Sequence, residues 1–109
     1  QIEGGILQGL SRALYEEVPV GGESGLDWTT YPVLRFSDVP AIELVLVDRP
    51  GLPPLGAGEA STPVTPAALA NALDDAIGVR VRSLPLTPDR LRARLEELDD
   101  AELARVRLS

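Results

Sequence analysis

The chain contains no cysteine and no histidine. Without cysteine it forms no disulfide, presents no thiolate nucleophile and cannot hold a metal or an iron–sulfur cluster through sulfur. Without histidine it lacks the commonest metal ligand and the commonest general base. A serine–histidine triad is therefore excluded within this chain. Any proton transfer near neutral pH is left to a carboxylate or to a group that another molecule supplies.

Lysine is absent too, so the 10 basic residues are all arginine, against 17 acidic residues and a net charge of −7. A nucleic-acid-binding surface needs a basic patch, and this composition argues against nucleic acid as a partner. Half of the arginines gather in one part of the chain: Arg80, Arg82, Arg90, Arg92 and Arg94. An acidic run over residues 96–102 follows them, and we interpret the two groups as a solvated face of paired charges.

Long apolar runs are also missing, and none approaches the roughly 20 residues that a membrane-spanning helix needs. No signal peptide opens the chain. The sequence leaves the location open between the cytoplasm and the periplasm. The 109 residues, 44% of them apolar and 25% charged, are typical of one globular domain over residues 1–109. Because the chain starts with Gln1 inside a helix-forming stretch, we expect a piece of a longer protein.

Apolar residues at helical spacing predict three helices. They are expected at residues 2–18, at residues 66–77 and from Pro88 onward. For the second helix, Thr65 is a suitable N-cap, Pro66 suits the first helical position and Gly78 suits the C-terminal cap. The first helix contains Gly4, Gly5 and Gly9, each unfavourable in a free helix by about 1 kcal/mol relative to alanine. They indicate either close packing against another backbone or ligand, or a weakly formed helix start.

Alternating apolar and polar residues predict strands between these helices. The expected strands are residues 33–37, 41–48 and 79–84, with Pro40 separating the first two. Residues 49–61 are rich in glycine and proline, which suits either a flexible linker or a rigid, shaped loop. The sequence therefore predicts an α+β fold, a mixed sheet with helices packed on one face.

One carboxylate stands out because of its setting, Glu59 at the end of the run Gly56-Ala57-Gly58-Glu59. Gly58 has no Cβ, so the backbone there is able to approach a bound group closely. A carboxylate held in such a place is suited to act as a general base. The alternative is a solvated glutamate that the dipole of the following helix favours. Gln1 has both donor and acceptor capacity and suits a cofactor edge, or else it is a disordered terminus.

Three stretches, taken in order, resemble one family of enzymes. They are residues 1–10 (QIEGGILQGL), residues 31–40 ending in DVP, and residues 56–59 (GAGE) with the alanine-rich helix that follows. Together they resemble the C-terminal part of the molybdopterin-binding subunit of the xanthine dehydrogenase / aldehyde oxidase family. The sequences of residues 59–63 and 79–88 are similar to those of the isoquinoline 1-oxidoreductase branch of this family. The resemblance covers a family-like core at residues 1–95, and residues 96–109 are a C-terminal tail.

The resemblance implies a molybdenum hydroxylase that oxidises an aldehyde or an N-heterocycle with oxygen derived from water. It implies that Glu59 is the catalytic base, and that Gln1, Ala57 and Gly58 lie at the molybdopterin cofactor, which brings its own metal ligands. It also implies two partners, the remainder of the molybdopterin subunit and an iron–sulfur subunit. The isolated chain is then expected to be inactive and without bound cofactor. The alternative is a non-catalytic, truncated remnant that serves as a small folded or self-associating module.

Overall fold

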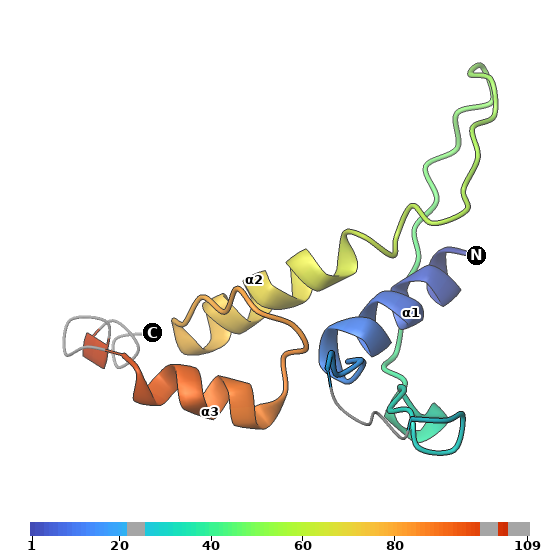
Figure 1. The fold of residues 1–109 in the computed structure, drawn as a ribbon. Helices are drawn as coiled ribbons and strands as arrows, with labels where there is room; N and C mark the ends of the chain where they lie inside the picture. The colour runs from blue at the N-terminus through green and yellow to red at the C-terminus, as the bar shows by residue number, and fades with distance from the viewer. Residues whose placement is uncertain (22–25, 99–102, 105–109) are drawn as a thin grey trace.

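The computed structural model describes residues 1–21, 26–98 and 103–104, and within these ranges the regular structure is helical. The elements are α1 (Ile2–Leu14), the short 3₁₀ helix η1 (Phe36–Asp38), α2 (Thr65–Ile77) and α3 (Pro88–Glu96). Helix α1 packs along α2, and α3 lies near the C-terminal half of α2 (Figure 1). Residues 22–25, 99–102 and 105–109 lie outside the described residues, and with them most of the predicted C-terminal tail.

The predicted α+β fold is wrong, because the described ranges contain helices and no strand. Residues 33–35, 41–48 and 79–82 are irregular, with none of their backbone groups paired into a ladder. An alternating pattern favours an extended chain, but a sheet also needs a second strand at hydrogen-bonding distance. Residues 79–82 show the pattern without the pairing, since Val79 and Val81 are buried while Arg80 and Arg82 are exposed.

Helix α1 ends at Leu14, four residues before the predicted end. In its last turn, Ser11 bonds to two residues outside the helix: its buried hydroxyl donates to Glu16 Oε1 at 2.5 Å and accepts from the Leu34 amide at 3.0 Å. Tyr31 donates to the other carboxylate oxygen of Glu16 at 3.2 Å. The bonds to Leu34 and Tyr31 join residues 15 or more apart in the sequence, which hydrophobic periodicity does not reveal.

Helix α2 matches its prediction closely at both ends. Gly78 follows the last residue in the left-handed conformation, with φ 67° and ψ 16°, and its amide donates to the Asp74 carbonyl at 2.8 Å. The start differs in one respect, because Thr65 is the first helical residue and Val64 is the N-cap. The buried Thr65 hydroxyl donates to the Ser61 carbonyl at 2.7 Å, so it fixes the preceding turn and does not cap the helix.

The hydrophobic core lies between α2, α3 and the connection that joins them. Its buried members in the described ranges are Val79, Val81, Leu86 and Leu98. Partly buried residues pack around them: Leu14, Leu69, Leu73, Ile77, Leu91, Leu95 and Leu103. The Leu86 amide donates to the Ala13 carbonyl at 2.6 Å and thereby fastens the connection to the end of α1. The core thus holds the three helices together.

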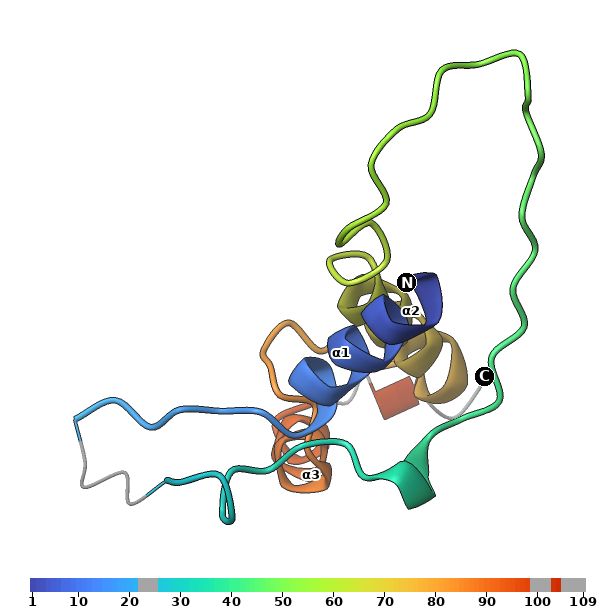
Figure 2. The same ribbon diagram turned by 90° about the vertical axis from the view of Figure 1, so that its right-hand side faces the viewer.

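A long excursion between η1 and α2 leaves this helical body. Residues 39–57 run outward and return, and the turned view separates the two legs (Figure 2). The radius of gyration is accordingly 17.5 Å, whereas a compact domain of this length has about 13 Å. In the described part of the chain, no helix combines the length and the apolar character that crossing a membrane requires.

Candidate functional site

The predicted base Glu59 lies in a tight turn between the excursion and α2. The Thr62 amide donates to the Glu59 carbonyl at 3.1 Å, and the Thr65 amide and hydroxyl both donate to the Ser61 carbonyl. These bonds fix the backbone on the C-terminal side of Glu59. Its side chain is exposed, so within this chain the backbone of Glu59 is fixed while its carboxylate faces solvent.

Helix α1 forms the surface on which this turn lies. Gly5 and Gly9 are buried, and a Cβ on Gly5 would clash with Ser61 Oγ. A Cβ on Gly9 would come 2.7 Å from Thr65 Cβ and 2.8 Å from the Thr62 carbonyl oxygen. Ser61 Oγ also donates to the Ile2 carbonyl at 2.9 Å. The expected close packing of the α1 glycines is therefore confirmed for Gly5 and Gly9.

Gly4 differs from the other two glycines, because a Cβ there would meet nothing within 4 Å. The same holds for Gly56 and Gly58 in the excursion and the loop that follows it. The expected close approach at Gly58 therefore has no counterpart within the described part of this chain.

Gln1 connects the start of α1 to the loop before Glu59. Its Nε2 donates to the Gly58 carbonyl at 2.5 Å across 57 residues of sequence. The structure therefore brings Gln1, Gly58 and Glu59 to one end of the molecule, with Ala57 exposed in the same loop. An amide, a backbone carbonyl and a carboxylate can hydrogen-bond a polar ligand. In the described ranges no three histidine, cysteine, aspartate or glutamate side chains group as metal ligands.

The sequence reasoning missed the hydroxyl residues that seat this turn, Ser61, Thr62 and Thr65. Thr62 Oγ1 is buried and has no hydrogen-bond partner among the described residues. A signal for them was present, because Gly5 and Gly9 are four residues apart and so share one face of a helix. Two glycines on one face require a close neighbour with small side chains, and the run Ser61-Thr62 after Glu59 offers one.

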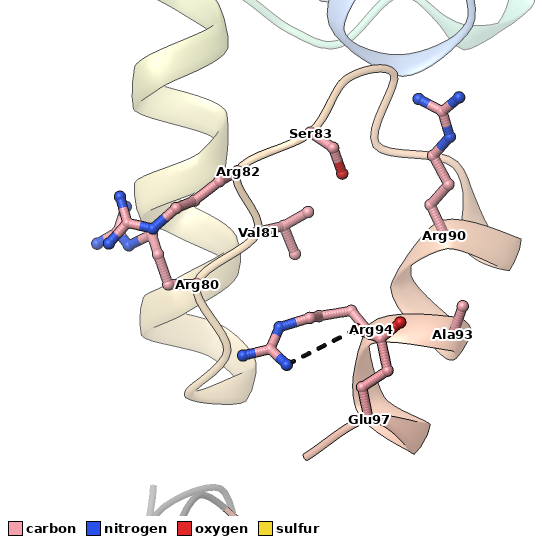
Figure 3. Close-up of a pocket in the computed structure, with 8 residues that line it drawn as sticks. All are labelled: Arg80, Val81, Arg82, Ser83, Arg90, Ala93, Arg94 and Glu97. Atoms are coloured by element: carbon pink, nitrogen blue, oxygen red, sulfur yellow. Dashed lines mark ion pairs between the residues drawn. The ribbon is translucent and has the colours of Figure 1, made fainter.

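A cavity of about 530 Å³ lies between the connection to α3 and α3 itself (Figure 3). It is lined by Arg80, Val81, Arg82, Ser83, Arg90, Ala93, Arg94 and Glu97. Arg80 pairs with Asp74 and Arg90 with Glu17, each at 2.5 Å. Arg92 pairs with Asp89 at 2.7 Å, and Arg94 with Glu97 at 3.9 Å.

Four of these five arginines form ion pairs with described acids, but the partners of Arg80, Arg90 and Arg92 lie outside the acidic run over residues 96–102 that was predicted to pair with them. Among the described residues, Arg94 pairs with the acidic run that begins at Glu96, and the other three arginines pair with Asp74, Glu17 and Asp89. The guanidinium groups of Arg80 and Arg90 lie on opposite sides of the cavity in Figure 3. Because both are paired with acids and do not converge, Arg80 and Arg90 do not form an anion site together.

Two titratable groups near the end of α1 have shifted pKa values. The pKa of Asp27 lies below its ordinary 3.8, because the hydroxyl and amide of Thr29 and those of Thr30 donate hydrogen bonds to the carboxylate. The pKa of Tyr31 is raised above 10.0 by desolvation first, and then by the hydrogen bond and negative charge of Glu16. The bonds of Asp27 are local to its turn, whereas Tyr31 bonds across 15 residues to Glu16, and both lie far from Glu59 in sequence.

Known proteins resemble this chain over most of its length. The B subunit of nicotinate dehydrogenase from Pseudomonas putida is 41% identical over 97 residues, which are 87% of this chain and 8% of that protein. The beta subunit of isoquinoline 1-oxidoreductase from Brevundimonas diminuta is 40% identical over 90 residues, 81% of this chain and 11% of that protein. PaoC, the molybdenum-binding subunit of an Escherichia coli aldehyde oxidoreductase, is 34% identical over 107 residues, 90% of this chain and 15% of that protein.

Molybdenum-binding subunits of xanthine dehydrogenase are among the other relatives. The chain therefore belongs to the xanthine dehydrogenase / aldehyde oxidoreductase family and corresponds to a segment of its molybdenum-binding subunits. This confirms the resemblance seen in the sequence, the isoquinoline 1-oxidoreductase relative included. The chain spans 8 to 15% of the length of the three relatives described above. No family model matches it, and no solved structure matches it.

Proposed function

We propose that this chain forms part of a molybdenum hydroxylase and supplies the catalytic base, Glu59. The relatives support the class of enzyme, since their names describe molybdenum-binding subunits and oxidoreductases of aldehydes and N-heterocycles. The observation that carries the proposal is the hydrogen bond from Gln1 to the Gly58 carbonyl. It joins the two motifs that lie farthest apart in the resemblance and sets Glu59 beside the start of α1.

The proposed reaction converts a C–H bond and water into a C–OH bond, two protons and two electrons. When bound, the molybdenum cofactor would accept the two electrons, and its dithiolene would supply metal ligands that this chain lacks. Glu59 would accept one proton at a carboxylate oxygen as the water-derived oxygen attacks an electron-poor carbon of the aldehyde or N-heterocycle.

The geometry around Glu59 suits this role. The bonds from Thr62 and Thr65 fix the backbone on the C-terminal side of Glu59, and the bond from Gln1 to Gly58 fixes it on the N-terminal side. The carboxylate is thus presented from a rigid turn, which lowers the entropy that is lost on reaching a reactive geometry. Gln1 Oε1 has no hydrogen-bond partner among the described residues and is available to a polar cofactor edge, as are the nearby backbone groups of Ala57 and Gly58.

The proposal includes two partners. The remainder of the molybdenum-binding subunit would complete the cofactor site, and an iron–sulfur subunit would carry the electrons away. Relatives named as subunits of dehydrogenases support an assembly of several chains. The isolated chain is then inactive, because it offers one base and one edge of the site.

The test is Glu59→Gln in the complete enzyme. The change keeps the size of the side chain and removes its basicity, so kcat is expected to fall by about 10²–10⁴-fold while the molybdenum content stays at the wild-type level. Glu96→Gln is the matched control, since Glu96 is an exposed glutamate of α3 with no part in the site, and it leaves kcat unchanged. Wild-type turnover by Glu59→Gln would refute the role of this residue.

A further inference from the structure

The outward leg of the excursion carries an apolar segment that the helical body does not cover. Residues 42–47 (IELVLV), here called the arm, contain Val45, Leu46 and Val47, each 76% exposed. Leu52 and Leu55 on the returning leg are exposed as well. Both faces of the arm are apolar at its centre, because alternate residues of an extended chain point to opposite sides. Contiguous exposed apolar groups of this kind mark an interaction site.

The backbone of the arm also lacks hydrogen-bond partners within the described part of the chain. In the described ranges no hydrogen bond joins an arm amide or carbonyl to another residue. The turn at the tip is closed by a bond from the Leu52 amide to the Arg49 carbonyl at 3.1 Å, and the two legs stay apart (Figure 2). Burying these side chains would bury the backbone groups with them, which is unfavourable unless each group finds a partner.

We infer that the arm docks by strand addition onto an open sheet edge in the remainder of the molybdenum-binding subunit. Strand addition satisfies the backbone groups and buries alternate side chains at the same time. A segment that is apolar on both faces fits a sheet that is covered on both faces. The strand partner is outside the described residues, which form no sheet among themselves. The inference rests on the proposed function, because it requires that the chain is part of such a subunit.

Two observations favour this occupant over a second copy of the chain. The matched segment makes up 8 to 15% of the relatives, so in them it belongs to a much longer chain that offers further surface to cover the arm. The chain also has a net charge of −7, so two copies repel each other at long range. Flanking charges at Glu43 and Asp48 would limit the apolar contact to the residues between them.

Hydrogen exchange in the complete subunit tests the inference directly. We expect amides of residues 44–47 to exchange at least about 100-fold more slowly in the complete subunit than in the isolated chain, because strand pairing protects them. The amides of Val18 and Val20, which are also exposed here, give the reference for a segment outside the arm. Equal exchange of the arm in the two samples would overturn the inference, whatever the activity of the enzyme.

A pair of substitutions separates docking from general surface effects. Val45→Asp in the complete subunit is expected to abolish the protection of residues 44–47 or to lower the yield of folded subunit by about tenfold, because a charge at the centre of a buried strand is unfavourable. Val20→Asp changes a fully exposed valine outside the arm and is expected to do neither. Wild-type protection and yield with Val45→Asp would contradict strand docking. A dimer of the isolated chain that Val45→Asp makes monomeric, with an unprotected arm in the complete subunit, would assign the arm to a second copy instead.

The outcome is separable from that of the proposed function. Glu59→Gln leaves the arm untouched, so protection of the arm is expected to persist in that variant. An enzyme in which Glu59→Gln keeps full turnover while the arm is protected refutes the catalytic proposal and supports the docking inference. An unprotected arm in an enzyme that Glu59→Gln inactivates refutes the docking inference and supports the catalytic proposal.

Discussion

At the scale of single residues, two glycines set the distance between α1 and the turn that carries Glu59. The positions that a Cβ would occupy on Gly5 and Gly9 are already filled by Ser61, Thr62 and Thr65. A helix normally disfavours glycine, so their presence reflects the contact and not the helix. The same contact brings Gln1 within reach of Gly58.

Gly9→Ala is therefore expected to destabilise the chain by about 1–3 kcal/mol, because the added methyl group meets the Thr62 backbone and Thr65. Gly4→Ala is the matched control in the same helix, where the space is open, and it is expected to raise the free energy of unfolding by up to about 1 kcal/mol. Urea unfolding followed by circular dichroism measures both. Equal effects of the two substitutions would contradict the packing described here.

The turn around Asp27 is expected to weaken in acid. Hydrogen bonds from Thr29 and Thr30 lower the pKa of Asp27 in the folded chain, so the stabilisation is present above the ordinary value of 3.8 and is lost as the pH falls through the lower, folded value. An NMR titration of the Thr29 and Thr30 amides would follow the loss. Asp27→Asn keeps an acceptor without a titrating charge, and its amide shifts should not change in this pH window.

At the scale of elements, helix ends with local signals follow the sequence and helix ends with distant partners do not. Gly78 ends α2 as predicted, because a left-handed residue after a helix is a local requirement. The end of α1 depends on Ser11, Glu16 and Leu34, which meet only in the folded chain. At the start of α2 the difference is local, since the Thr65 hydroxyl donates to the carbonyl of Ser61, four residues earlier, and does not cap the helix.

Gly78→Ala tests the local requirement. Alanine at a φ of 67° is strained, so we expect the free energy of unfolding to fall by about 1 kcal/mol. Gly51→Ala is the control, because Gly51 has neither a positive φ nor a crowded Cβ position, and it should change stability little. Thermal and urea unfolding of both variants would decide. A neutral Gly78→Ala would show that the helix end does not depend on this conformation.

At the scale of the whole molecule, the hydrophobic core of the helical body is formed without the excursion. The core residues come from the three helices, the 79–86 connection and the segment after α3, and none comes from residues 39–57. The radius of gyration of 17.5 Å reflects this separation. The chain thus combines a small folded body with an apolar extension whose burial requires another surface.

Replacing Val45, Leu46 and Val47 together by serine is expected to leave the unfolding free energy of the isolated chain within about 0.5 kcal/mol of wild type. The three side chains are mostly exposed, so the folded state loses no buried contact. Aggregation, measured by light scattering, should decrease because the exposed apolar surface is smaller. The triple variant Leu69→Ser, Leu73→Ser and Ile77→Ser, which removes contacts of α2 with the core, should instead prevent cooperative folding.

The sequence by itself determined the three helices, the chemistry available to the chain and the family. The helices follow from local properties, namely helical spacing and a C-terminal glycine. A missing residue type excludes its chemistry in any fold. The family is recognisable because its motifs occur in order along the sequence. The sequence also predicted that Gln1 and Glu59 belong to one site, although only through the family resemblance.

Only the tertiary structure decided whether the alternating segments pair, and in the described ranges they do not. It also decided that Gln1 contacts Gly58, that Ser61 and Thr65 seat the turn on α1, and that the apolar residues of the arm face solvent. The physical reason is common to all of these. Each of these features needs a contact with residues that are distant in sequence: a paired strand, a neighbour for a buried glycine, or a cover for an apolar side chain. A local sequence pattern indicates that such a contact is needed but does not identify the residues that make it.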